Sequence, residues 1–166
     1  MTRRSALAVS GLIVSLLLVV GCATPYDIGN ADPRVTPVEA AKDVAGMLNH
    51  TVAWGGLIAA AKNLKDQTEL EVVGYPLDTE NRPDSNAAPT GRFLVVQTGY
   101  LETADYAPGR LITVVGTVTE TRRGTVGEAP YVYPVVAASQ LRLWPKPTGD
   151  RREPGFHFGI GVGIIR

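Results

Sequence analysis

From residue 51 onward the chain consists of short runs rich in Val, Ile and Leu, separated by Gly, Pro, Asp and Asn. Runs of this length are typical of β-strands, and glycines inside several of them indicate a sheet that bends strongly. The pattern predicts a mainly β fold, a small five-stranded OB-like barrel that is closed or partly open. The predicted strands are 52–61, 69–76, 92–98, 110–119 and 135–144.

A helix start signal precedes the strands. Thr36 supplies a capping hydroxyl, Pro37 suits the first helical position, and Glu39 stands three residues after the cap. One short N-terminal helix is therefore predicted over 37–49. Its core-facing side is predicted to comprise Val38, Ala41, Val44, Ala45 and Leu48.

The N-terminus has the layout of an export signal. Arg3 and Arg4 precede an apolar run over 7–20, which is shorter than the roughly 20 residues that a membrane-spanning helix needs. We therefore assign 1–21 to a cleavable signal peptide. The alternatives are a short signal anchor and an ordinary signal that is cut elsewhere.

Cys22 directly follows this run, after the small Gly21, and this arrangement resembles the lipobox of bacterial lipoproteins. Val19 and Val20 depart from the commonest residues of that motif. The resemblance implies that the Cys22 thiol receives a diacylglyceryl group and that the signal is cut just before it. Several acyl chains on one residue give stable membrane attachment. Ala23 replaces the Asp that tends to retain such proteins in the inner membrane, which implies the outer membrane.

The segments on either side of the predicted barrel lack its pattern of short apolar runs separated by turn residues. Residues 22–35 carry Pro, Asn and Asp without apolar periodicity, so they predict a flexible tether, and the β domain is expected over 36–146. The loop 78–91 is expected to be mobile, and the basic segment 122–130 to form a turn.

The tail 147–166 is rich in Pro and Gly, and from residue 155 its apolar residues alternate with His or Gly. That period of two predicts a strand with one apolar face. Such a strand either packs on its own barrel or pairs with another copy of the chain or with an envelope partner.

The composition excludes several classes of function. Lys plus Arg number 16 and Asp plus Glu number 16, which argues against nucleic-acid binding because that needs a surplus of cations. The single cysteine allows no intramolecular disulfide. With two histidines besides it, no Cys/His metal cluster is expected, and no cofactor motif is present.

The candidate catalytic residues each have a structural explanation. Glu69 and Glu71 alternate on one strand and share a solvated face. His50 has no visible partner, and a hydrolase would require a carboxylate such as Asp105 buried beside it. Ser85 and Ser139 lack a nucleophile elbow, Gly55-Gly56 lacks the lysine of a phosphate loop, and we assign no catalytic residue.

Two further sets of residues have binding potential. The aromatic residues could form a stacking face, although in small barrels they more often fill the core. The pairs Arg122-Arg123 and Arg151-Arg152 could touch anionic headgroups, although solvated turns are the simpler explanation. The aromatic set is Trp54, Phe93, Tyr100, Tyr106, Tyr131, Tyr133 and Trp144.

Several strings of residues along the predicted strands carry a family resemblance. They are Val52-Ala53-Trp54-Gly55-Gly56-Leu57-Ile58, Thr68-Glu69-Leu70-Glu71-Val72, Gly91-Arg92-Phe93, Gly109-Arg110-Leu111-Ile112-Thr113-Val114-Val115-Gly116-Thr117-Val118 and Leu141-Arg142-Leu143-Trp144-Pro145. With the lipobox they resemble the Slp family of outer membrane lipoproteins, named after a starvation-inducible member. The resemblance implies a lipid-anchored β domain of the cell envelope, linked to stress or stationary phase, without established catalytic residues. The chain departs from the family after Pro145.

We therefore expect an outer membrane protein that is lipid-anchored, faces the periplasm and acts as a non-enzymatic scaffold or partner-binding protein. Its expected partners are the membrane, through the N-terminal lipid, and an envelope protein or a second copy, through the tail. A small-ligand or envelope-polymer binder is the alternative, and an envelope hydrolase the third possibility.

Overall fold

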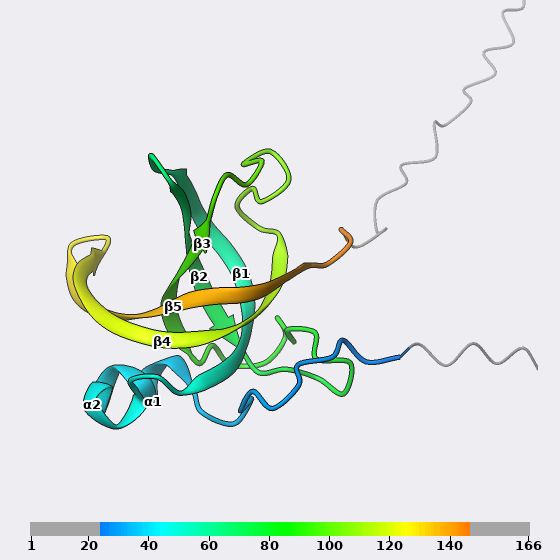
Figure 1. Ribbon diagram of the computed structural model, residues 1–166, viewed down its shortest axis with the longest axis horizontal. Helices are drawn as coiled ribbons and strands as arrows, with labels where there is room; N and C mark the ends of the chain where they lie inside the picture. The colour runs from blue at the N-terminus through cyan, green and yellow to red at the C-terminus, as the bar shows by residue number, and fades with distance from the viewer. Residues whose placement is uncertain (1–23, 147–166) are drawn as a thin grey trace, which may run out of the picture.

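The computed structural model describes residues 24–146, and their fold is mainly β (Figure 1). Five strands form a closed barrel in the order β1-β2-β3-β5-β4, in which only the β3–β5 pairing is parallel. The predicted five-stranded OB-like barrel is confirmed. The elements are α1 (Pro37–Lys42), α2 (Val44–Met47), β1 (Thr51–Asn63), β2 (Gln67–Tyr75), β3 (Gly91–Thr98), β4 (Leu111–Val126) and β5 (Ala129–Leu143).

Apolar side chains from all five strands fill the barrel. Along β2 buried and half-buried residues alternate strictly, as a strand with one inward face requires. Trp54 and Trp144 are 3% and 7% exposed, so for both the expectation that the aromatic residues are buried rather than exposed in a stacking face is confirmed. The Trp54 and Phe93 rings meet edge to face with centroids 5.1 Å apart. At Gly56 a Cβ would collide with the Val73 carbonyl oxygen, which explains a glycine inside this strand.

The single helix predicted over 37–49 is wrong in its length and in its buried face. The chain forms two short helices separated by Asp43, whose carboxylate accepts a hydrogen bond from the Gly46 amide (3.0 Å) and starts α2. Pro37 and Ala40 are buried, whereas Val38 is 37% exposed and Leu48 is 41% exposed. A second N-cap thus interrupts the apolar periodicity that suggested one helix.

The basic turn predicted over 122–130 is also wrong. β4 continues to Val126, and a two-residue turn with Gly127 at φ 59° leads directly into β5. We call residues 120–126 of β4 and 129–135 of β5 the β4–β5 arm. It extends beyond the β1–β4 pairing and forms the hairpin at the left of Figure 1. In this arm Arg122 of β4 pairs with Tyr133 of β5. The sequence did not indicate a strand here, because a stretch with two arginines lacks the apolar alternation by which strands are recognised.

The segment expected to be a flexible tether instead lies on the barrel over residues 26–35. The Asp32 amide donates to the Thr51 carbonyl (3.1 Å), and the Ala53 amide donates to the Asp32 carbonyl (3.2 Å). Ala31 is buried with Ala53 and Val115. These contacts arise because β1 offers backbone groups at its N-terminal end, where a short parallel bridge forms.

Candidate functional site

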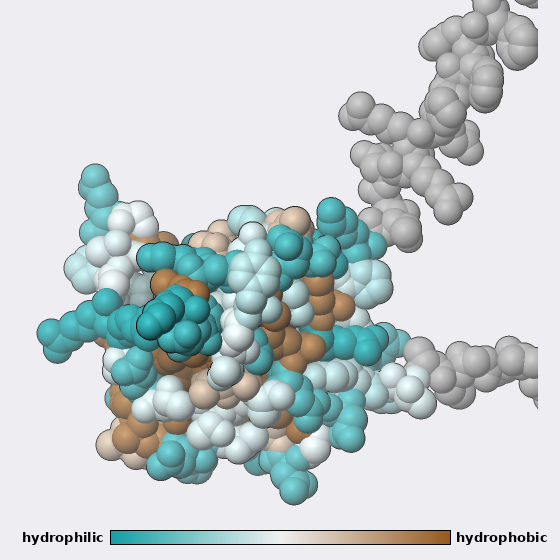
Figure 2. Space-filling view, turned by 45° about the horizontal axis from the view of Figure 1, so that its top comes forward, coloured by the Kyte–Doolittle hydropathy of each residue, from teal (hydrophilic) through white to brown (hydrophobic). Residues whose placement is uncertain are grey.

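A cleft of about 370 Å³ lies between the N-terminal segment and the adjoining ends of β1 and β2; we call it the front cleft. Its volume falls within the range of small-molecule and side-chain pockets, roughly 300–1,000 Å³. Elsewhere, apolar side chains reach the surface in separate patches between polar ones, as Figure 2 shows for one face. The front cleft is lined by residues 33–37, Ala53, Trp54, Gly55, residues 75–78, Asn81 and Thr90.

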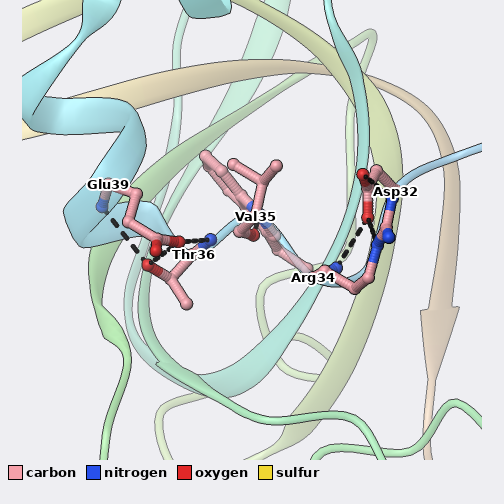
Figure 3. Close-up of polar contacts among 6 residues, drawn as sticks. Asp32, Arg34, Val35, Thr36 and Glu39 are labelled. Carbon is pink, nitrogen blue, oxygen red and sulfur yellow. Dashed lines mark hydrogen bonds and ion pairs between the residues drawn. The ribbon is translucent and has the colours of Figure 1, made fainter.

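A tight turn at Asp32 shapes the first wall of the front cleft (Figure 3). The Asp32 carboxylate accepts hydrogen bonds from the Arg34 amide (2.8 Å) and from its guanidinium Nε and Nη2 (3.0 Å each). The guanidinium hydrogen bond is the main reason that the pKa of Asp32 lies below its ordinary value. The Arg34 side chain is 87% exposed, so it presents a cation beside the cleft.

Two further contacts fix the continuation of this wall. The Trp54 indole Nε1 donates to the Val35 carbonyl oxygen (2.6 Å), which joins the segment to the barrel core. The Thr36 hydroxyl accepts from the Glu39 amide (3.2 Å), and the Glu39 carboxylate accepts from the Thr36 amide (2.8 Å). This capping box is the predicted one. The hydrogen bond from the Thr36 hydroxyl is the largest cause of the lowered pKa of Glu39.

The loop after β2 forms the opposite wall and is joined to the N-terminal segment. Asn81, at φ 59°, donates from Nδ2 to the Tyr26 carbonyl (2.8 Å), and its own carbonyl accepts from the Thr113 hydroxyl (2.8 Å). The Tyr26 amide donates to the Glu80 carbonyl (3.1 Å). Both walls therefore depend on residues that sequence reasoning assigned to a tether and a mobile loop. The Asp32 turn was the available signal, since Asp favours such turns.

The outer face of β2 and β3, which OB folds use to bind oligonucleotides, is covered by the β4–β5 arm. Tyr133 and Val135 of the arm pack with Leu94 of β3 in a small second core. The Tyr133 hydroxyl lies within hydrogen-bond distance of the Glu71 carboxylate (3.2 Å) and of the Thr125 carbonyl (2.9 Å), and these two acceptors share its single proton. Burial, and then the charge of Glu71, raises the pKa of Tyr133.

Ion pairs complete this cover. Arg92 donates to Glu71 (2.6 Å), and Arg122 of the arm pairs with Glu69 of β2 and with Glu120 (3.0 Å). Glu69 and Glu71 thus share one face, as predicted, but this face is not solvated: the arm lies over it and both carboxylates pair with arginines. The aromatic stacking platform does not form, because Trp54, Phe93, Tyr133 and Trp144 are buried while Tyr100 is 71% exposed.

The other candidate residues lie apart. Among residues 24–146 no hydrogen bond or ion pair joins His50 to Glu69, Glu71 or Asp105, and both His50 and Asp105 are exposed. The Ser139 hydroxyl donates to the Val115 carbonyl (3.0 Å). Ser85 is exposed in the loop after β2.

Within residues 24–146, no three His, Cys, Asp or Glu side chains lie close enough together to hold a metal ion. None of the helices in this part of the chain has the length and apolar character that a membrane-spanning helix needs. Cys22, the signal 1–21, the pair Arg151-Arg152 and the predicted tail strand lie outside the described residues.

Comparison with known proteins places the chain among outer membrane lipoproteins. It is 28% identical over 157 residues to the uncharacterized lipoprotein YeaY of Escherichia coli K12, covering 87% of this chain and 79% of YeaY. It is 29% identical over 136 residues to the outer membrane protein Slp of the same organism, covering 80% and 72%.

Among solved structures, the small single-stranded DNA-binding protein from Streptomyces coelicolor is 16% identical, with a TM-score of 0.34. The match covers 58% of this chain and 95% of that protein, and a score this low carries no inference about ligands. The family model of the outer membrane lipoprotein Slp family matches residues 19–160, so the likeness extends beyond Pro145, where the chain was expected to depart from the family. The chain therefore belongs to the outer membrane lipoprotein Slp family.

Proposed function

We propose that this protein is a lipid-anchored binding protein of the outer membrane, which faces the periplasm and holds an envelope partner in its front cleft without catalysing a reaction. The lipid is attached at Cys22, directly after the signal 1–21. The role belongs to envelope stress or stationary phase, as the family resemblance implies. Family membership supports the location, and the front cleft supports the binding role.

The front cleft is the single observation that carries this proposal. Its lining combines apolar side chains such as Trp54 and Leu77 with polar groups at Thr36, Asn81 and Thr90. An apolar floor with a few polar groups suits an apolar side chain flanked by polar backbone. The exposed Arg34 beside it offers a charge-assisted hydrogen bond to a partner carboxylate, in competition with Asp32.

The absence of a reactive pair among the described residues favours binding over hydrolysis. Glu69 and Glu71 are each engaged by an arginine, and no residue of the front cleft is a histidine or cysteine. General acid–base catalysis needs a titrating group within hydrogen-bond reach of a bound substrate. The cleft offers Asp78 at its edge, and that carboxylate accepts hydrogen bonds from the Glu80 and Arg82 amides (2.8 and 2.9 Å).

A matched pair of tyrosines allows a direct test in intact cells. A photo-reactive phenylalanine analogue replaces Tyr75, which lines the front cleft, or Tyr100, which is 71% exposed on the loop after β3. We expect irradiation to give a discrete protein adduct from position 75 and none from position 100. The substitution Leu77→Ala should reduce that adduct.

The same experiment separates the alternatives. An adduct at position 75 with the mass of a small molecule, found by mass spectrometry of the purified protein, would show that the front cleft holds a small ligand instead. Equal adducts from positions 75 and 100, or none from either, would contradict a binding role for the cleft.

A further inference from the structure

The docking of Tyr26 on the barrel limits how far the domain can stand from its lipid. The Tyr26 backbone is held by Glu80 and Asn81, and its hydroxyl donates to the Gln140 Oε1 (3.2 Å). Three residues lie between Cys22 and Tyr26. A fully extended chain covers at most about 3.6 Å per step, so the four steps from Cys22 to Tyr26 span roughly 14 Å at most. The surface around Tyr26 must therefore lie close to the membrane if Cys22 carries the lipid.

That surface carries cations over aromatic rings; we call Tyr26, Arg82, Arg142 and Lys146 the anchor-side surface, and the two arginines lie over the buried Trp144 ring. The Arg142 guanidinium lies 4.9 Å from the centroid of the Trp144 ring and 5.6 Å from that of Tyr26. The Arg82 guanidinium lies 5.8 Å from the Trp144 ring. In Figure 1 both ends of the described chain leave on this side, opposite the tip of the β4–β5 arm.

The charges around the anchor-side surface indicate which kind of binding partner is complementary to it. Carboxylates lie near the cations, at Asp27, Asp78, Glu80 and Asp84, so the region is mixed rather than strongly basic. A polyanion would be repelled by these carboxylates as well as attracted by the arginines. A phospholipid headgroup carries both a phosphate and, in phosphatidylethanolamine, an ammonium group, and therefore matches a mixed surface. Arginines stacked on aromatic rings suit this depth of the membrane interface.

We infer that the anchor-side surface rests on the phospholipid headgroups of the membrane that holds the lipid anchor, with Arg142 and Lys146 on the phosphates. This inference rests on the proposed lipid attachment at Cys22. The contact fixes the orientation of the domain, so that the β4–β5 arm points away from the bilayer. The barrel therefore keeps a fixed orientation relative to the membrane instead of rotating freely on its linker.

The test uses the full-length lipidated protein in vesicles of phosphatidylethanolamine and phosphatidylglycerol. Because Cys22 is the only cysteine and its thiol carries the lipid, a single introduced cysteine takes a fluorescent label uniquely. Ser85→Cys places the label beside Arg82, and Glu128→Cys places it at the tip of the arm. We expect nitroxide-labelled headgroups to quench the label at position 85 strongly and the label at position 128 weakly.

A longer linker between Cys22 and the domain distinguishes binding of headgroups by the anchor-side surface from simple confinement of the domain near the membrane by its short linker. Inserting twenty Gly/Ser residues after Ala23 gives a flexible span of about 25 Å (root mean square), long enough to release the domain. Quenching at position 85 should persist in this long variant and fall to the level of position 128 when Arg142→Gln and Lys146→Gln are added. The control pair Lys42→Gln and Arg123→Gln, both exposed, should leave the quenching unchanged.

Each other result overturns the inference. Equal quenching at positions 85 and 128 shows that the domain has no fixed orientation. If Arg142→Gln and Lys146→Gln leave the quenching of the long variant unchanged, these cations do not bind the headgroups. Melting curves check that the variants compared are folded. Protein that fails to float with the vesicles overturns the lipid anchor itself, and the proposed location with it.

Discussion

Replacing Trp54 should destabilise the barrel in two separable steps. The indole is 3% exposed, packs edge to face on Phe93 at 5.1 Å, and donates its Nε1 hydrogen bond to the Val35 carbonyl at 2.6 Å. Trp54→Ala removes the ring and leaves a cavity, at a cost of about 3–5 kcal/mol of unfolding free energy. A domain of this size has about 5–15 kcal/mol in total, so this variant is expected to be marginally folded.

Trp54→Phe keeps an aromatic ring against Phe93 but removes the donor, which leaves the Val35 carbonyl without its partner. The expected loss is about 1–3 kcal/mol, the penalty for an unsatisfied buried acceptor. Because Val35 belongs to the wall of the front cleft, this variant should also loosen residues 33–37 while the barrel stays folded.

Urea titration followed by circular dichroism measures both losses, and Trp144 gives an independent fluorescence signal in each variant. Tyr100→Ala, at a residue that is 71% exposed, should stay within about 0.5 kcal/mol of the parent. A Trp54→Ala variant within about 1 kcal/mol of the parent would refute the central packing role of this side chain.

Three further predictions concern the anchor, the capping box and the tail. Cys22→Ser should abolish incorporation of a labelled palmitate analogue and block cleavage after Gly21; label retained at the N-terminus would contradict the lipid assignment. Glu39 has a pKa held below its ordinary value of 4.5 by hydrogen bonds to Thr36, so its contribution to stability is present above that value and is lost as pH falls through the lower, folded-state pKa. The stability difference between the parent and Glu39→Gln should therefore shrink on acidification in urea titrations, and a difference that does not change with pH would refute this role. Deleting 155–166 should remove self-association or a crosslinked partner with little change in melting temperature, whereas a large fall in that temperature would show that the tail belongs to the barrel.

The barrel was predictable because its signal is repeated along the chain. Every predicted strand overlaps an observed one, since apolar runs bounded by turn residues reflect burial in a sheet directly. The glycines inside the strands were informative for a physical reason, because at Gly56 and Gly116 a side chain would strike the backbone of the neighbouring strand. Closure of a small sheet requires such close approach.

The front cleft was not predictable, because its walls depend on long-range contacts of polar residues. Asp32 pairs with the start of β1, and Asn81 joins Tyr26 across 55 positions of sequence. Such backbone and side-chain amide hydrogen bonds leave no periodic pattern in the sequence, so these residues were predicted to form a linker and a loop. The β4–β5 arm escaped prediction for a related reason, since Arg122 is held by ion pairs with Glu69 and Glu120, and a charged residue in a strand leaves no apolar alternation.

The last prediction tests whether the β4–β5 arm is fastened to β2 and β3 as a separate unit. Tyr133 is 5% exposed, and its hydroxyl proton is shared between Glu71 and the Thr125 carbonyl. Tyr133→Phe removes this buried donor while keeping the ring against Leu94, so we expect a loss of about 1–3 kcal/mol that is confined to the arm. Native-state hydrogen exchange should show faster exchange for amides of residues 120–135 and unchanged exchange in β1 and β2, with Tyr100→Phe as the control. Equal acceleration throughout the barrel would show instead that the arm opens only with global unfolding, and that the cover over β2 and β3 is an inseparable part of the core.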